Sequence, residues 1–127
     1  MTYIDGFVIA CPENKKQAFI DHASRADPFF LEQGALRVVE AWGDDVPEGK
    51  TTDFRLAVKA EEGEAVLFSW IEWPDKATRN ACFAKMMAEG FSDPRMSPET
   101  NPMPFDGKRM IFGGFVPVVS LEKEERA

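Results

Sequence analysis

The chain has 127 residues, of which 44% are hydrophobic and 12% aromatic. This composition is typical of one globular domain over 1–127 and excludes an intrinsically disordered chain. Its 22 acidic residues outnumber 15 basic ones, and the net charge of −7 argues against binding to nucleic acid or anionic membranes.

Residues 3–11 (YIDGFVIAC) form the first predicted strand, with apolar side chains on both faces. Pro12 then opens a helix at the position that proline favours. Apolar residues recur at the helical period up to Gly34, where we expect the helix to end. Pro28 interrupts the pattern, so we expect a kink or a break there, with Asp27 capping the second piece.

Residues 35–42 (ALRVVEAW) form the second predicted strand, in which Arg37 and Glu40 lie among apolar residues. The acidic, turn-rich segment 43–52 (GDDVPEGKTT) is a predicted loop. Residues 53–60 (DFRLAVKA) alternate only weakly and are too few to specify a helix, so their pattern leaves both structures open.

The stretch 65–88 (AVLFSWIEWPDKATRNACFAKMMA) combines a strand with the helix that covers it. Its first part, 65–73, is apolar on both faces. An antiparallel strand with one wet face would alternate apolar with polar residues, so we expect this strand to be covered on both sides. Pro74 ends the strand, and Asp75 is a suitable N-cap for a helix that runs to Gly90.

Residues 91–107 carry four of the nine prolines, so we expect an ordered flap without regular structure. The last predicted strand covers 108–121. We expect a bulge or bend at Gly113–Gly114 and an edge position at Pro117. Residues 122–127 form a charged tail that we expect to be frayed.

The order strand, helix, strand, strand, helix, strand predicts an α+β fold of the ferredoxin-like βαββαβ type, with an antiparallel sheet and its helices on one face. Two helices can cover only one face of a four-stranded sheet. Because the other face is also apolar, we expect a second copy of the chain to cover it. The predicted assembly is therefore a homodimer through the open sheet face, a dimeric α+β barrel.

Four stretches resemble the YbaA-like family of small uncharacterised bacterial proteins, within the dimeric α+β barrel superfamily. They are YIDGFV (3–8), GALRVVEAWGDDVPEGKTTDF (34–54), VLFSWIEWPDKATR (66–79) and DGKRMIFGGF (106–115). The resemblance spans nearly the whole chain and implies the same fold and dimer. It implies no activity, because the family has no established reaction. Relatives in the superfamily include cofactor-independent monooxygenases, haem-handling proteins and stress-responsive barrels, and fold does not decide among them.

Charged residues interrupt strands that are otherwise apolar: Asp5, Arg37, Glu40 and Glu72. If they are buried, they must be paired, because an unpaired buried charge is costly. One interpretation is structural, with edge charges or ion pairs at the dimer interface. The other is a polar cluster lining a cleft, in which the forked guanidinium of Arg37 would bind a substrate carboxylate or enolate.

His22 is the only histidine and borders the apolar stripe of the first helix. It is either a satisfied boundary residue or a proton shuttle or ligand contact. A lone histidine without an HxH or HExxH pattern predicts no metal site. Trp42 and Trp70 belong either to the core or to the wall of an apolar pocket that binds a ligand.

The expected cellular compartment and the expected lack of a cofactor depend on motifs that are absent from the sequence. Cys11 and Cys82 match neither a disulfide framework nor a metal motif. No apolar run approaches the roughly 18 residues of a membrane span, and the first residues carry no export signal. We therefore expect a cytoplasmic protein without a membrane or nucleic-acid partner. Because the sequence has no glycine-rich phosphate-binding loop, we also expect no cofactor.

Two functions of different classes are compatible with these residues. The first is a small-molecule binding or stress-associated accessory protein, with the ligand held between sheet and helices under the 91–107 flap. The alternative is a cofactor-independent oxygenase or isomerase acting on an aromatic or enolisable substrate, with His22, Asp5 and Glu72 as candidate proton acceptors. A third possibility is a purely structural barrel with no cavity.

Overall fold

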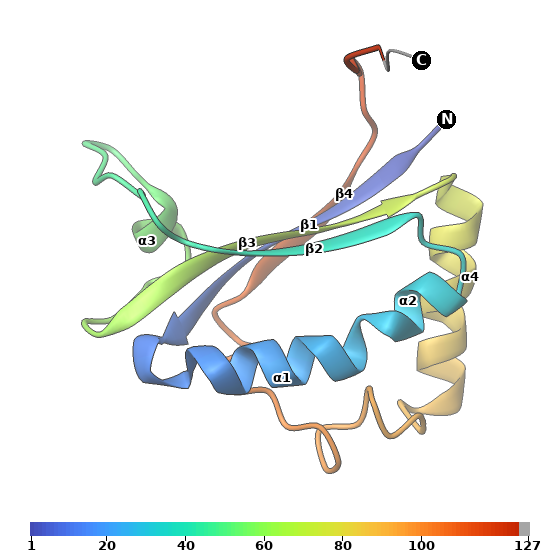
Figure 1. Ribbon diagram of the computed structural model, residues 1–127, viewed down its shortest axis with the longest axis horizontal. Coiled ribbons are helices and arrows are strands. Elements are labelled where there is room, and N and C mark those ends of the chain that lie inside the picture. Colours follow the sequence, from blue (N-terminus) through green and yellow to red (C-terminus); the bar gives the residue numbers. More distant parts are fainter. Residues whose placement is uncertain (125–127) are drawn as a thin grey trace.

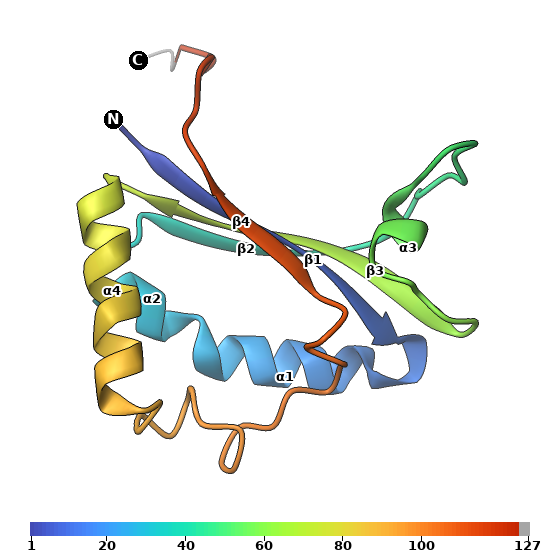
Figure 2. The same cartoon turned by 180° about the vertical axis from the view of Figure 1, so that it is seen from behind.

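The computed structural model describes residues 1–124, whose strands form one four-stranded antiparallel sheet. The elements are β1 (Tyr3–Pro12), the 3-10 turn η1 (Glu13–Lys15), α1 (Lys16–Ala26), α2 (Pro28–Glu32), β2 (Arg37–Trp42), α3 (Phe54–Ala57), β3 (Glu64–Trp73), α4 (Lys76–Glu89) and β4 (Ile111–Phe115). The strand order is β2-β3-β1-β4. Helices α1, α2 and α4 lie on one side of the sheet (Figures 1 and 2). The predicted ferredoxin-like α+β fold is confirmed.

The two central strands hold the core together. β1 and β3 pair from Tyr3 opposite Trp73 to Pro12 opposite Glu64. Alternation then sends one set of side chains toward the helices, and that set is almost fully buried, with Trp73 at 0% and Leu67 at 1% exposure. The opposite, open face keeps large apolar side chains in contact with solvent.

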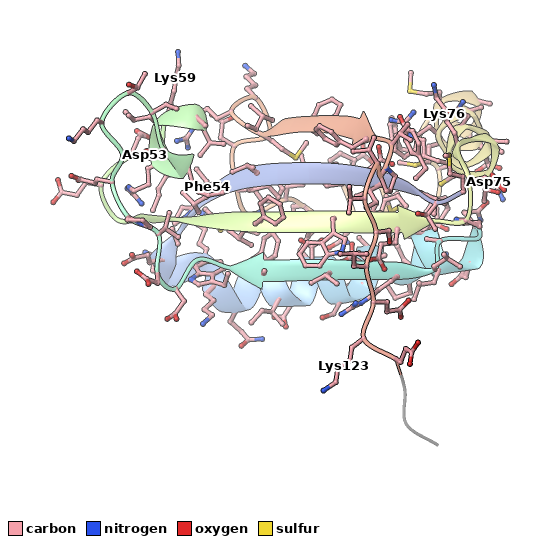
Figure 3. All side chains as sticks on the ribbon, turned by 90° about the horizontal axis from the view of Figure 1, so that it is seen from above. Asp53, Phe54, Lys59, Asp75, Lys76 and Lys123 are labelled. Atoms are coloured by element: carbon pink, nitrogen blue, oxygen red, sulfur yellow. The ribbon has the colours of Figure 1, made fainter. Side chains whose placement is uncertain are left out.

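Helix α3 covers only one end of the open face. It occupies part of the segment 53–60, which the sequence pattern left open between helix and strand. Asp53 starts it by accepting a hydrogen bond from the Leu56 N–H at 2.7 Å. After it, Val58 is buried against Ala10. Among the described residues, only the segment after β4 crosses the rest of the open face (Figure 3).

The first helical region breaks at Pro28, as predicted, but its ends differ from the prediction. Pro12 is the last residue of β1 and pairs with Glu64 of β3. The α-helix therefore begins only at Lys16, after the turn η1. Asp27 makes no capping hydrogen bond with its side chain. It lies in right-handed helical backbone and is therefore not in the extended conformation that an N-cap usually has. The predicted capping role of Asp27 is wrong.

Helix α4 has the ends that the sequence predicts. Asp75 accepts a hydrogen bond from the Thr78 N–H at 2.7 Å, which satisfies one of the free donors of the first turn. Gly90 ends the helix in the left-handed conformation, with φ of 60°, where glycine carries no steric penalty.

The last strand is much shorter than the predicted 108–121, because β4 covers only Ile111–Phe115. Phe115 pairs with Ile4, close to the beginning of β1, so little of the neighbouring strand remains to pair with later residues. Pro117 also lacks an N–H group. Residues 116–124 therefore leave the sheet as an irregular C-terminal arm (Figure 1). Of the predicted frayed tail 122–127, residues 125–127 lie outside the described part. None of the helices within residues 1–124 has the length and apolar character needed to cross a bilayer.

Candidate functional site

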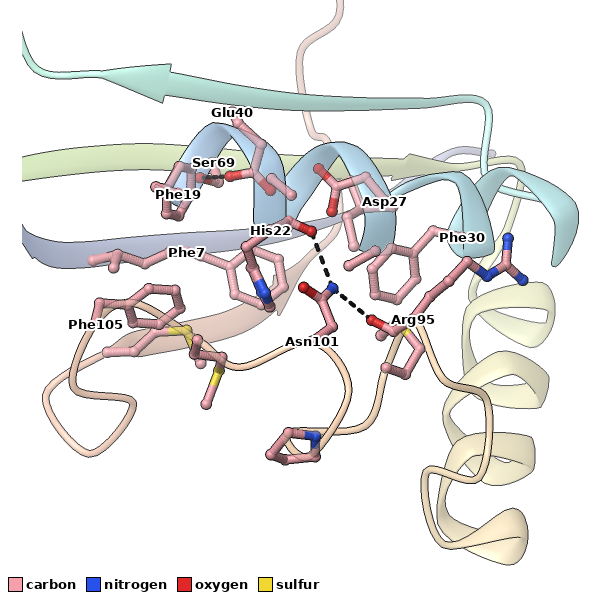
Figure 4. Close-up of a pocket in the computed structure, with 18 of the residues that line it drawn as sticks. Phe7, Phe19, His22, Asp27, Phe30, Glu40, Ser69, Arg95, Asn101 and Phe105 are labelled. Atoms are coloured by element: carbon pink, nitrogen blue, oxygen red, sulfur yellow. Dashed lines mark hydrogen bonds between the residues drawn. The ribbon is translucent and has the colours of Figure 1, made fainter. Parts of the chain in front are cut away.

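A cavity of about 460 Å³ lies between the helix-facing side of the sheet and the segment that follows α4 (Figure 4). Its walls are mostly aromatic and methionine side chains from β1, α1, α2, α4 and the segment 91–110. Among them are Phe7, Phe19, Phe30, Met86, Phe105 and Met110. The hydrophobic core therefore does not fill the space under the centre of the sheet.

Asn101 holds the irregular 91–107 segment in place under the cavity by two hydrogen bonds. Its side-chain N–H groups donate to the backbone carbonyls of Arg95 at 2.8 Å and His22 at 3.2 Å, and the residue is only 4% exposed. Phe105 packs on Phe19 with a ring distance of 5.9 Å. The predicted ordered flap thus closes the cavity through one buried amide and an aromatic contact.

Two carboxyl groups meet at the edge of this cavity, from Asp27 and Glu40 (Figure 4). Asp27 lies at the break between α1 and α2, and Glu40 projects from the helix-facing side of β2. Burial raises the pKa of Asp27 to about 8, and the charge of Glu40 and a hydrogen bond to its carboxyl act in the same direction. At neutral pH Asp27 therefore keeps its proton and donates it to the Glu40 carboxyl in a hydrogen bond.

Ser69 fixes the position of Glu40. The two residues lie opposite each other in the β2–β3 register, and the Ser69 hydroxyl donates to Glu40 Oε2 at 2.5 Å. Ser69 is 3% exposed whereas Glu40 is an exposed residue, so this hydrogen bond lies at the boundary between the buried sheet face and solvent. A polar residue at this position on an apolar strand face is a signal in the sequence for a polar site under the sheet.

Asp27→Asn is expected to change how stability depends on pH. The pKa of Asp27 is about 8 in the folded protein against an ordinary 3.8, so the folded chain binds more protons, and the free energy of unfolding falls as pH rises between these values. The asparagine amide still donates to Glu40 but does not ionise. Relative to wild type, the variant should gain at least about 1 kcal/mol between pH 5 and pH 9 in urea unfolding.

The matched control for this prediction is Asp45→Asn, in the exposed loop after β2. It should show the same difference from wild type at both pH values. A pH-independent difference for Asp27→Asn as well would mean that Asp27 is ionised throughout this range.

His22 extends from α1 into the cavity (Figure 4). Its ring contacts Phe105 edge-to-face at 6.3 Å between centroids. Its Nδ1 atom is buried and has no hydrogen-bond partner within residues 1–124. Because buried polar atoms are nearly always paired, this nitrogen is available to a molecule inside the cavity.

Asp5, a candidate proton acceptor in the sequence, does not line the cavity. It is 2% exposed and accepts a hydrogen bond from Trp73 Nε1 at 2.9 Å. Its carboxylate also pairs with the Arg79 guanidinium, with Nη2 and Oδ1 2.9 Å apart. Asp5 on β1 thus forms a structural ion pair with Arg79 on α4 and a hydrogen bond with Trp73 on β3.

The other predicted site residues are divided between the two sides of the sheet. Arg37 and Glu72 are opposite each other in the β2–β3 register and face the open side. Trp70 contributes to the cavity and to a hollow on the open face, whereas Trp42 lines a groove at the β2 edge. His22 is therefore the one predicted catalytic residue in the cavity, and Trp70 the one predicted ligand-binding residue.

The hollow on the open face has a volume of about 590 Å³ and an apolar lining. Phe68 and Phe115 contribute to it and are 47% and 61% exposed. The C-terminal arm begins at its rim with Val116 and crosses above the sheet in Figure 3. Val118 and Leu121 of the arm are 92% and 91% exposed.

Comparison with known proteins gives a family match and a structural match. Residues 2–107 match the family described as "Protein of unknown function (DUF1428)". The chain is 58% identical over 119 residues to the uncharacterized protein YbaA of Escherichia coli K12, covering 94% of this chain and 98% of YbaA. The YbaA protein of Shigella flexneri has the same identity and coverage.

Among solved structures, the chain resembles a dimeric ferredoxin-like protein from an uncultured marine organism. The TM-score is 0.59 and the sequence identity 12%, over 95% of this chain and 100% of the other. At this identity the similarity concerns the fold alone.

Proposed function

The chain belongs to the DUF1428 family of proteins of unknown function, and we propose that it binds a small, largely apolar molecule in the cavity under its sheet. The cavity volume of about 460 Å³ carries this proposal. Protein interiors are close-packed and contain few voids larger than a water molecule, whereas ligand pockets span about 300–1,000 Å³ with a few polar groups on apolar walls. A purely structural barrel would not leave such a space.

Filling the cavity is expected to abolish binding. Ala23 is 7% exposed and lines the cavity, so Ala23→Leu places three more carbon atoms in the space that a ligand needs. We expect the affinity for the neutral fluorescent probe N-phenyl-1-naphthylamine to fall at least tenfold. Native mass spectrometry of the purified protein should show any co-purifying ligand in wild type and not in this variant.

Ala18→Leu is the matched control, because it makes the same change on the exposed side of the same helix. It should bind the probe like wild type. Equal probe affinity in the two variants, both with wild-type circular dichroism, would exclude the cavity as the binding site.

Acid–base catalysis in the same cavity is a second candidate function, favoured by the Asp27–Glu40 pair. A general acid or base works best when its pKa is near the working pH, and the pKa of Asp27 is raised to about 8. A cofactor-independent isomerase needs only one such group beside an enolisable carbon. Exchange of solvent deuterium into an aryl ketone is the assay that separates catalysis from binding.

We also propose that the protein is a homodimer through its open sheet face. Exposed aromatic side chains cluster there, and they include Phe68, Phe112 and Phe115. An apolar surface of this kind is unusual on a monomer. The C-terminal arm extends over the same face (Figure 3), and its valines are exposed, so a two-fold partner would cover both. Cys11 and Cys82 are both buried and do not form a disulfide with each other, which supports the proposed cytoplasmic location.

A further inference from the structure

If the cavity binds a small molecule as proposed above, we infer that this ligand is an amine whose ammonium group contacts Asp27 and Glu40. The inference comes from the hydrogen-bonding inventory of the cavity. Asp27 and Glu40 offer unused carboxyl oxygens to the cavity, whereas the donors of Ser69, Asn101 and Arg95 already have partners within the protein.

The donors of three polar side chains in the cavity, Ser69, Asn101 and Arg95, are occupied. The Ser69 hydroxyl donates to Glu40, and both side-chain N–H groups of Asn101 reach backbone carbonyls. The Arg95 guanidinium is turned away from the cavity (Figure 4). It is held by Glu32 at 2.6 Å and Asp93 at 2.9 Å.

The acceptors remain available. Asp27 and Glu40 line the cavity and together carry four carboxyl oxygens. The buried Nδ1 atom of His22, which has no partner among the described residues, is a further acceptor in the tautomer that is protonated at Nε2. An ammonium group has three donors and no acceptor. It therefore matches this set, whereas a carboxylate or phosphate would bring only further acceptors to a negatively charged pair.

The surroundings of the pair suit an organic cation. The aromatic walls attract a cation through their ring faces. The charged or titratable groups near the pair are His22 on α1, Arg95 in the flap and Lys16 in the groove outside. The Lys16 ammonium lies over the Trp42 ring, 5.5 Å from its centroid. Asp27 and Glu40 line this outer groove as well as the cavity, whereas Lys16 and Trp42 line only the groove. Within residues 1–124, no basic side chain forms a salt bridge with either carboxyl group.

Binding of an ammonium ion displaces the proton of Asp27. The ligand keeps its three N–H bonds, the carboxylic O–H bond of the pair breaks, and the proton leaves to solvent. Calorimetry in two buffers with different ionisation enthalpies should therefore show proton release on binding at pH 7. No covalent bond to the ligand changes.

Three probes of similar size test the inference: 2-phenylethylamine, 2-phenylethanol and phenylacetate, each used to displace N-phenyl-1-naphthylamine at pH 7. We expect the amine to bind at least ten times more tightly than the alcohol, and phenylacetate more weakly still. In Glu40→Gln, the ratio of amine to alcohol affinity should fall toward one. Asp45→Asn, a charge change in the exposed loop, should keep the wild-type ratio.

Two results would overturn the inference. One is an alcohol or carboxylate that displaces the dye as well as the amine does. The other is failure of the amine to displace a dye whose binding is sensitive to Ala23→Leu. In both cases the cavity still binds ligands, and only the ligand class is wrong. A dye insensitive to Ala23→Leu would instead refute the proposed binding function itself.

Discussion

Phe68→Lys is expected to convert the proposed homodimer into a monomer. Phe68 is on the open face of β3, with its ring against Phe54 at 6.1 Å and Trp70 at 5.8 Å. It is already 47% exposed in the protomer, so a lysine there can reach solvent and the fold should persist. In the dimer, the same ammonium would be buried among apolar groups, at a cost of several kcal/mol.

Sedimentation equilibrium at micromolar concentration measures this effect. Wild type should give twice the chain mass of 14.3 kDa, and Phe68→Lys the single chain mass. Met87→Lys is the control, since Met87 is 73% exposed on α4, on the other side of the sheet. A wild-type protein that sediments as a monomer would contradict the proposed dimer.

Much of the fold was predictable because the alternation of residues along each strand and the residues at the helix ends match the structure that forms. The strand residues Val66, Phe68 and Trp70 do share one face, and Leu67 and Ile71 the other, as period-two alternation requires. Likewise Asp75 and Gly90 end α4 by local backbone chemistry alone. The end of β4 was not predictable in this way, because it depends on how much of β1 remains to pair with it.

The polar part of the cavity was only partly predictable. Glu40 is recognisable as a charge on an apolar strand face, and His22 as a titratable group beside an apolar stripe. The meeting of Asp27 with Glu40 depends on how α1 packs on β2, which local periodicity does not determine. Asp27 also precedes Pro28, and that position favours a capping interpretation. Asn101 lies in a proline-rich segment without any periodic pattern.

Asp5→Ala is expected to destabilise the protein by about 3–5 kcal/mol, because removing one partner of a buried ion pair leaves the other charge uncompensated. The Arg79 guanidinium would lose two hydrogen bonds from Nε at 3.2 Å and one from Nη2 at 2.9 Å. The Trp73 N–H, on a fully buried indole, would lose its acceptor as well. Urea unfolding should show a much lower midpoint.

Two further variants determine what Asp5 contributes. Asp75→Ala removes an exposed helix cap and should cost only about 1 kcal/mol, so an equal loss for Asp5→Ala would contradict the structural role. Asp5→Leu combined with Arg79→Met replaces the ion pair by apolar groups and should recover part of the stability. If the double variant folds and still binds N-phenyl-1-naphthylamine like wild type, Asp5 acts through the β1–β3–α4 packing. Loss of binding in a stable double variant would instead return Asp5 to the candidate site that the sequence suggested.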